Sequence, residues 1–184
     1  MANSTANVTY GKPNKAGAVF TAPLGTTLPT DATTALGSGF TGLGYVSEDG
    51  LTNSYSRDIE DVKAWGGDTV LTLETDMTDE WSFSLLESLN SDVLEVFYGE
   101  DNVTVSNGEI SIKVNSDQKA NRVWVFDMSL AGGGKKRIVL PNAVITETED
   151  IPYKDDEAVI YGFTLKALPD ANGNTHYEYI SAGE

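Results

Sequence analysis

Alternation of apolar and polar side chains with a period of two dominates the chain from Phe40 onward. In DEWSFSLLE, residues 79–87, Trp81, Phe83 and Leu85 fall on one face and polar side chains fall on the other. This period is typical of a strand with one buried face. Further strands are expected at Ala16–Ala22, Phe40–Val46, Val70–Thr75, Val103–Val105, Glu109–Val114, Arg122–Met128, Arg137–Thr146, Glu157–Leu168 and Thr175–Ile180.

One segment has helical rather than strand-like spacing. Asn90 or Ser91 can cap its first turn, and Gly99 is placed to end it. The apolar side chains between them follow one stripe of an amphipathic helix. The pattern therefore predicts a helix at about residues 90–98, which is too short to be stable unless it packs on a sheet.

The order of these segments predicts the architecture. Arg122–Met128 is apolar on both faces, which indicates a strand buried on both sides. Pro141 within Arg137–Thr146 requires a sheet edge or a bulge, because proline cannot donate to the ladder. Tight turns, such as Asn107-Gly108 between two strands, favour antiparallel pairing. We expect a mainly β fold: an antiparallel β-sandwich or flattened barrel of roughly nine strands, with one flanking helix and extended loop arms.

The first forty residues have a different composition. They are rich in Thr, Ala and Gly, and beyond the short strand at Ala16–Ala22 they show turn residues and little periodicity. Structureless stretches of this length are unusual inside a compact domain. We expect residues 1–40 to form an extended N-terminal arm with a short strand, of which 21–39 reaches a neighbouring molecule, and residues 41–184 to form a single β-sandwich domain.

A second non-periodic stretch follows the expected turn at Glu48–Gly50. Residues 52–68 carry aromatic and charged side chains and end at Trp65–Gly67, without any set of residues equipped for catalysis. The segment is predicted to be a long polar connection between strands. Such a connection suits contact with another protein better than chemistry on a small molecule.

The charge of the chain argues against one class of partner. Twelve Lys and Arg stand against 28 Asp and Glu, which gives a net charge of −16. Binding to nucleic acid requires cations that displace counterions from phosphates, and the densest basic cluster is only Lys135–Arg137. We expect no grip on DNA, although DNA can pass nearby without sticking. No apolar run of about 18 residues is present, so no membrane partner is expected.

Candidate catalytic and metal-binding patterns are weak. Cysteine is absent, and His176, the only histidine, is interpreted as an ordinary surface residue. The carboxylate pairs, such as Glu60 with Asp61, are expected by accident among 28 acids. Asp170–Asn174 lacks the spacing of a calcium loop and predicts a hairpin turn, whereas Gly132–Lys136 predicts a flexible basic surface turn rather than a phosphate loop. We therefore expect no enzyme, no catalytic residue, no metal and no cofactor.

Three stretches together resemble the major tail protein, or tail tube protein, of long non-contractile bacteriophage tails of the siphovirus type. Their order and spacing match as well, and the resemblance runs from Gly42 to the C-terminus. The stretches are Gly42–Thr52 (GLGYVSEDGLT) with Ala64–Asp68 (AWGGD), Asp79–Ser88 (DEWSFSLLES), and Pro141–Asn174 (PNAVITETEDIPYKDDEAVIYGFTLKALPDANGN).

The resemblance implies a structural virion protein. Six copies would close into a ring, and rings would stack into a tail tube whose acidic lumen delivers the genome. The implied partners are further copies of the chain, a tape-measure protein, a tail terminator and baseplate proteins. DNA would pass through the lumen without specific binding. The tube would be assembled in the host cytoplasm and would reside in the phage tail.

Candidate contacts between subunits come from the polar connection and the basic cluster. Trp65 has two interpretations, as a core residue or as an interface anchor. The full set of candidates is Tyr55, Arg57, Asp58, Glu60, Asp61, Lys63, Trp65, Lys135, Lys136 and Arg137.

Two other functions remain open on the sequence. An adhesion or carbohydrate-binding β-sandwich would gather exposed aromatic rings, such as Tyr10, Tyr55, Tyr177 and Tyr179, on one face. A small hydrolase would use one of the carboxylate pairs.

Overall fold

The computed structural model describes residues 3–14 and 17–183. Its helical elements are α1 (Ser91–Tyr98) and the short 3-10 turns η1 (Thr5–Asn7), η2 (Glu100–Asn102) and η3 (Ala131–Gly133). Its strands are β1 (Lys12–Pro13), β2 (Val19–Pro23), β3 (Thr41–Gly42), β4 (Val46–Lys63), β5 (Thr69–Leu85), β6 (Val103–Ser106), β7 (Glu109–Ile112), β8 (Arg122–Ser129), β9 (Lys135–Thr148), β10 (Tyr161–Ala167) and β11 (Tyr177–Ser181).

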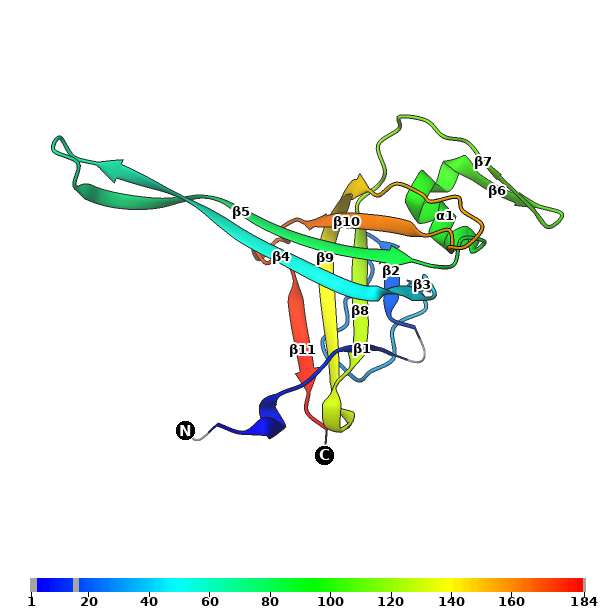
Figure 1. Cartoon of the computed structure of the whole chain (residues 1–184), viewed down its shortest axis with the longest axis horizontal. Coiled ribbons are helices and arrows are strands. Elements are labelled where there is room, and N and C mark those ends of the chain that lie inside the picture. The colour runs from blue at the N-terminus through cyan, green and yellow to red at the C-terminus, as the bar shows by residue number, and fades with distance from the viewer. Residues whose placement is uncertain (1–2, 15–16, 184) are drawn as a thin grey trace.

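One large antiparallel sheet forms the body of the molecule (Figure 1). Its strands follow the order β3-β2-β8-β9-β10-β5-β4, with β1 added beside β8 and β11 added beside β9. The strands β6 and β7 form a separate hairpin. Its turn contains Asn107 and Gly108, both at positive φ, as the Asn-Gly dipeptide predicts.

The strand β9 joins two parts of the large sheet. Along one side it pairs with β8. Along the other side its first half pairs with β11, up to Val139, and its second half pairs with β10, from Ala143 onward. Pro141 lies between these two halves, where the register with β8 also shifts. The predicted bulge is confirmed, and bulges of this kind let one strand bend from one layer to another.

The sheet folds over on itself around an aromatic core. Phe83 of β5 contacts Trp124 and Phe126 of β8, with ring centroids 5.6 and 5.4 Å apart, and stacks on Phe163 of β10 at 5.4 Å. Trp81 stacks on Phe126 at 5.9 Å. These contacts place β5 and β10 over β8, as in a sandwich. The mainly β, antiparallel prediction is confirmed, and because the sheet does not close, the structure is sandwich-like rather than a flattened barrel.

The predicted flanking helix is confirmed as α1. The side chain of Asn90 accepts a hydrogen bond from the backbone N–H of Asp92 at 3.0 Å, and Gly99 ends the helix at φ 103°. Phe97 inserts between Tyr161 and Phe163 of β10. Burial of its apolar stripe, rather than intrinsic propensity, therefore holds this short helix.

The predicted polar connection is wrong. Residues 52–63 belong to β4, which runs through the expected turn at Glu48–Gly50, and the two strands expected between residues 70 and 87 form one strand, β5. Gly50, at φ 73°, lies where the register shifts between Val46 and Leu51, so the turn residues are absorbed in a bulge. The outer ladder is exposed on both faces, so no burial selects the alternation that identifies a strand.

The N-terminal forty residues contribute to the body of the sheet. The strand β2 pairs with β3 on one side and with β8 on the other, and its Val19, Thr21 and Ala22 are buried. It overlaps the strand expected at Ala16–Ala22, although Ala16 itself lies outside the described residues. The division into an arm of 1–40 and a domain of 41–184 stays a prediction.

A buried ion pair fastens residues 31–34 to the sheet. Arg137 of β9 donates two hydrogen bonds to the Asp127 carboxylate of β8, at 2.6 and 2.7 Å. It also donates to the backbone carbonyls of Asp31 and Thr34, at 3.1 and 2.8 Å. The hydrogen bond with Asp127 raises the pKa of Arg137. Arg137, which the sequence groups with Lys135 and Lys136 as a candidate for subunit contacts, is buried inside its own subunit, where it pairs with Asp127 across the ladder.

Removal of Asp127 should destabilise the subunit strongly. Asp127→Ala leaves a buried, uncompensated guanidinium, and we expect a loss of about 3–5 kcal/mol in the free energy of unfolding. Urea denaturation followed by tryptophan fluorescence measures it. Lys136→Ala is the matched control, because it removes the neighbouring, more exposed Lys136–Glu178 pair and should cost about 0–1 kcal/mol. Equal losses in both variants would contradict the assignment.

Candidate assembly surfaces

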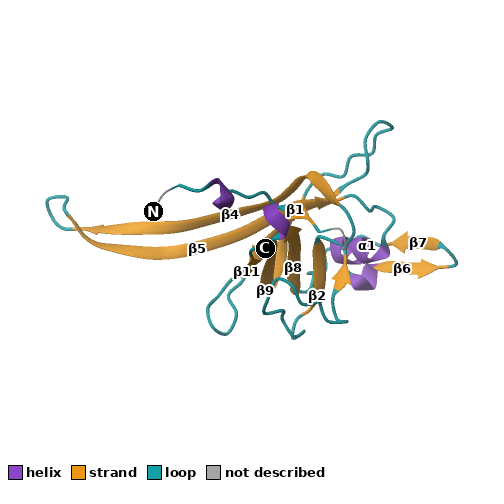
Figure 2. Ribbon diagram, turned by 90° about the horizontal axis from the view of Figure 1, so that it is seen from below, coloured by secondary structure: helices purple, strands orange, loops and turns teal. Residues whose placement is uncertain are grey.

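Part of the β4–β5 hairpin projects away from the rest of the molecule (Figures 1 and 2). We define residues 52–76 as the arm, and every one of them is exposed. In both views the arm extends away from α1 and the β6–β7 hairpin, which lie at the opposite end of the molecule. Among residues 3–14 and 17–183, the arm therefore packs on nothing beyond its own two strands.

Polar side chains hold one face of the arm together. Arg57 donates to the hydroxyl of Tyr55 at 2.7 Å and pairs with Glu74 across the ladder at 3.1 Å. Nearer the tip, Thr72 donates to Asp61 at 2.9 Å. This face continues the core-facing side of β5. Hydrogen bonds within the subunit thus engage several of the polar residues that were predicted to contact other subunits.

The opposite face of the arm is apolar near its tip. Val62 pairs directly with Leu71, and Leu73 is the next residue of β5 on the same face. The turn beyond them is tight: Ala64 donates its N–H to the carbonyl of Asp68 at 2.8 Å. Trp65, at the apex, is fully exposed, so its interpretation as a core residue is excluded. These exposed apolar side chains lie near one end of the arm, and such surfaces are typical of protein–protein contacts.

Two strands of five residues or more in the large sheet, β4 and β11, each have an edge that is open to pairing. Among the described residues, β4 pairs with β5 on one side only, and β11 pairs with β9 on one side only. β4 is 18 residues long, which is far longer than a protected edge strand normally is. Each edge presents free backbone donors and acceptors that a strand of another molecule can use.

The arm joins the core at a buried carboxylate. Asp79 of β5 has no exposed side-chain surface, and it accepts hydrogen bonds from Asn53 of β4 at 2.8 Å and from Thr175 at 2.7 Å. Its Oδ2 also lies 2.6 Å from Nδ1 of His176. The interpretation of His176 as an ordinary surface residue is wrong, since its side chain is three-quarters buried against Asp79 and Trp81.

The pKa shifts of this pair favour the charged state of both partners. Burial acts to raise the pKa of Asp79, but hydrogen bonds from His176, Thr175 and Asn53 outweigh it, and the pKa lies below its ordinary value. The hydrogen bond to Asp79 is the main cause that raises the pKa of His176. One ion pair therefore ties the base of the arm to the segment that precedes β11.

The sequence contained a signal for this network. Asp79 is in phase with Trp81, Phe83 and Leu85, so the alternation already placed it on the core-facing side of its strand. A carboxylate at such a position requires buried donors. The apolar tip was missed because Val62 and Leu71 lie on opposite sides of the Trp65–Gly67 turn, and only their pairing reveals one surface.

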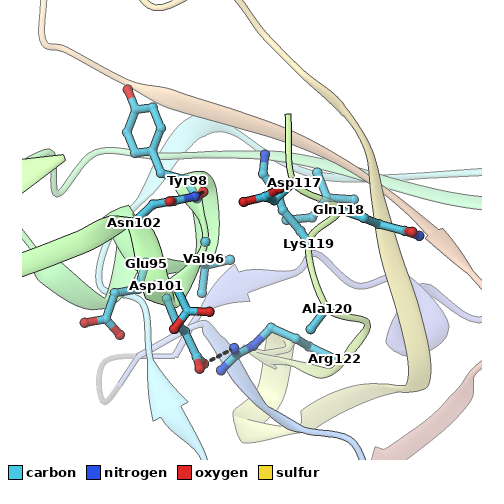
Figure 3. Close-up of a pocket in the computed structure, with 13 residues that line it drawn as sticks. Glu95, Val96, Tyr98, Asp101, Asn102, Asp117, Gln118, Lys119, Ala120 and Arg122 are labelled. Carbon is cyan, nitrogen blue, oxygen red and sulfur yellow. Dashed lines mark hydrogen bonds and ion pairs between the residues drawn. The ribbon is translucent and has the colours of Figure 1, made fainter. Parts of the chain in front are cut away.

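A cavity of about 180 Å³ lies between the C-terminal end of α1, η2 and the segment before β8 (Figure 3). Its charged rim is internally paired, since Arg122 forms an ion pair with Glu100. Burial lowers the pKa of Lys119, another lining residue. Close by, Asn102 and Asn115 exchange two amide hydrogen bonds at 3.1 and 3.0 Å. These contacts hold the segment before β8 against the helix. The cavity is therefore interpreted as a gap in side-chain packing.

Other candidate chemistry gains no support from the geometry. Within residues 3–14 and 17–183, no group of three or more acidic or histidine side chains could hold a metal ion. Glu60 and Asp61 are exposed neighbours on one strand, so they point to opposite faces. Asp170 accepts backbone N–H groups from Asn172 and Asn174, as in a simple turn. That turn links β10 and β11, which both pair with β9 rather than with each other, so it is not a hairpin turn.

The aromatic side chains of a carbohydrate-binding face are not gathered. Tyr177 and Tyr179 stack on β11, with ring centroids 6.4 Å apart. Tyr55 lies on the arm against Arg57, and Tyr10 lies in the N-terminal segment under the ammonium group of Lys12. The four rings therefore belong to three separate places on the surface.

The ten predicted interface residues fall into three groups. Seven of them, from Tyr55 to Trp65, lie together on the arm. Lys135 and Lys136 lie at the start of β9, where Lys136 pairs with Glu178 at 2.8 Å. Arg137 is buried inside the subunit. The first group is thus a single exposed element, whereas the basic cluster is divided between the surface and the core.

Comparison with known protein families identifies the family of the chain. A family model described as phage tail tube protein matches residues 2–183. The chain belongs to the phage tail tube protein family. The match confirms the predicted resemblance to a phage tail tube protein, which ran from residue 42 onward, and extends it through the N-terminal segment. Membership implies a structural rather than enzymatic role, self-assembly into a tube and a place in the phage tail.

Two solved structures are similar to this tail tube protein over nearly its whole length. One is the anti-feeding prophage cap, a tube terminating cap, with 9% identity, coverage of 98% of this chain and 100% of that chain, and a TM-score of 0.48. The other belongs to the sheath-tube complex of an extracellular contractile injection system in its extended state, with 10% identity, 98% and 99% coverage, and a TM-score of 0.44. At this identity and TM-score the similarities carry no argument about function. No curated protein matches the chain.

No helix among the described residues is long and apolar enough to cross a membrane.

The Asp79–His176 pair predicts a defined pH dependence of stability. Because the pKa of His176 is raised, its contribution to the free energy of unfolding is complete below the ordinary pKa of about 6.5. This contribution is lost as the pH rises through the higher pKa of the folded state. Because the pKa of Asp79 is lowered, its contribution to the free energy of unfolding is complete above the ordinary pKa of an aspartate. This contribution is lost as the pH falls through the lower pKa of the folded state.

We expect His176→Asn to cost about 1.5–3 kcal/mol near pH 6, the range for hydrogen bonds to charged groups, and less near pH 9. Urea unfolding of both proteins across this range measures the difference. Lys154→Gln, which removes an exposed ion pair with Glu157, should lower the free energy of unfolding only slightly, and by the same amount near pH 6 and near pH 9. A His176 effect of equal size at both pH values would refute the ion pair.

Proposed function

We propose that copies of this protein join head to tail into rings, which we expect to be hexameric, and that the rings stack into the tube of a long non-contractile phage tail. The observation that carries the proposal is the arm, whose apolar tip at Val62, Trp65 and Leu71 is left exposed by the described part of its own subunit. Exposed apolar groups of this kind call for a covering surface. In a family of tube proteins, the natural covering molecule is a second copy.

Ring closure draws on the open strand edges. Pairing between the edge of β4 or β11 and a strand of the next subunit would satisfy backbone groups that are otherwise left to water. Such a contact is heterologous, since it joins different surfaces of two identical subunits. Heterologous contacts generate rings when the rotation closes, and the arm then supplies the second contact between rings.

Electrostatics supports a conduit for the genome. A subunit with a net charge of −16 has few cations to displace counterions from phosphates. An acidic lumen would let DNA slide without specific binding. The arm itself carries six acidic and two basic side chains, which gives it a net charge of −4.

The remaining partners follow from this role. We infer that a tape-measure protein occupies the tube during assembly, and that a tail terminator and baseplate proteins lie at its two ends. Assembly takes place in the host cytoplasm, and the finished tube is part of the virion. We infer no enzymatic activity and no cofactor.

The cations that serve subunit contacts are those left exposed. Arg57 is exposed but already forms an ion pair with Glu74, whereas Lys63 lies beside the apolar tip. Lys135 is exposed at the start of β9. We propose Lys63 and Lys135 as the basic residues that most directly face neighbouring subunits.

A shortened arm should abolish tubes without damage to the subunit. Replacing residues 60–73 with Asn-Gly joins Ile59 and Glu74, which are already cross-strand partners, through a two-residue turn. Because every deleted residue is exposed, the unfolding midpoint should change little. Electron microscopy should show tubes for the wild type and none for the variant.

The change in net charge serves as a control for this deletion. The variant loses three acids and one base, so its charge moves from −16 to −14 and repulsion between subunits falls slightly. A loss of tubes then reports lost contacts rather than added repulsion. Normal tubes from the shortened protein would remove the arm from the assembly.

Added salt should accelerate polymerisation. Subunits that each carry −16 repel one another, and raising the ionic strength from about 0.01 M to about 0.15 M shortens the Debye length from roughly 30 Å to roughly 8 Å. Light scattering against time measures the rate. A rate that is unchanged over this range would show that charge repulsion does not limit assembly.

A further inference from the structure

A groove of about 510 Å³ opens on the body of the molecule between β1 and the first residues of β4. We call it the β1–β4 groove. Its floor is apolar and includes Leu51 of β4, Phe83 of β5 and Phe126 and Met128 of β8. Its rim carries a cation, Lys12 on the β1 side, and an anion, Glu48 on the β4 side.

The arm tip of the same chain has the matching properties. Trp65 is fully exposed at the apex of a turn closed by two backbone hydrogen bonds, from Ala64 to Asp68 at 2.8 Å and from Gly67 to Ala64 at 3.0 Å. These bonds fix the backbone from which the indole ring projects, so the turn loses little backbone freedom on binding. One cation, Lys63, and one anion, Asp68, stand on either side of it.

The tip cannot reach the groove of its own subunit. The groove lies at the Val46 end of β4 and the tip lies at the Lys63 end. The 18 residues of β4, at about 3.3 Å per residue, separate the two by roughly 55 Å of extended strand. Any contact between them therefore joins two molecules.

We propose that the β1–β4 groove receives the arm tip of a second copy of this chain, with Trp65 as the anchor on the apolar floor, an inference that rests on the proposed function. Lys12 of the rim then pairs with Asp68 of the incoming tip, and Glu48 pairs with Lys63. A groove of this volume accommodates an aromatic side chain and its apolar neighbours. The contact is heterologous and repeats from copy to copy, as a polymer requires.

Cross-linking between two introduced cysteines tests this contact, because the chain contains no cysteine of its own. The double variant Glu48→Cys/Ala64→Cys changes two exposed residues, one at the groove rim and one at the tip. A short bis-maleimide cross-linker should convert assembled protein into a ladder of covalent oligomers on a denaturing gel. Each single variant can give at most dimers, and Ala64→Cys/Asp156→Cys, with the exposed Asp156 outside the groove, is the matched control.

Charge reversal gives a second, independent measurement. Lys12→Glu should raise the critical concentration for assembly, and Asp68→Lys in the same chain should lower it again towards the wild-type value. Trp65→Ala should raise the critical concentration about 30-fold, the effect of losing an interface hot spot. Because these side chains are exposed, circular dichroism of each variant should match the wild type.

The outcomes separate this inference from the proposed function. Tubes together with a ladder confined to Glu48→Cys/Ala64→Cys support both. Tubes without that ladder, or with an equal ladder in the Asp156 control, overturn the groove contact and leave the tube function intact. If the wild type forms no tubes, the proposed function fails, and cross-linking of concentrated soluble protein decides the groove contact on its own, since a missing ladder there overturns it.

Discussion

The backbone ladder between β4 and β5 connects the aromatic core to the arm. At its inner end it carries Trp81, Phe83 and Leu85 into the aromatic core, and at its outer end it projects as the arm. Both ends share one continuous set of antiparallel pairs. The burial of the inner half therefore fixes the direction of the outer half, which has no core of its own to hold it.

The junction between the two halves is reinforced by polar groups. Asp79 sits where β5 passes from core to solvent, and its partners come from β4 and from the segment before β11. A desolvated carboxylate tolerates few arrangements of its donors. The network thus resists bending at the point where an exposed hairpin would otherwise be free to swing.

The distribution of charge explains why apolar and backbone contacts should dominate assembly. Five basic side chains form ion pairs within the described chain, namely Arg57, Arg122, Lys136, Arg137 and Lys154. With 12 Lys and Arg against 28 Asp and Glu, the cations cannot offset the whole acidic surface of a neighbour. Strand edges and the apolar arm tip do not need opposite charge to attract a second copy, so they suit a subunit with a net charge of −16.

The elements that pack on the core could be predicted from the amino-acid pattern. The alternation around Trp81, the cap at Asn90 and the Asn107-Gly108 turn each reflect local chemistry or one-sided burial, and each element appears where it was predicted. The conformation of residues 52–68 and the burial of Arg137 depend instead on long-range pairing. A strand exposed on both faces has no burial to impose a pattern, and the pairing of Arg137 with Asp127 exists only in the register of β8 with β9.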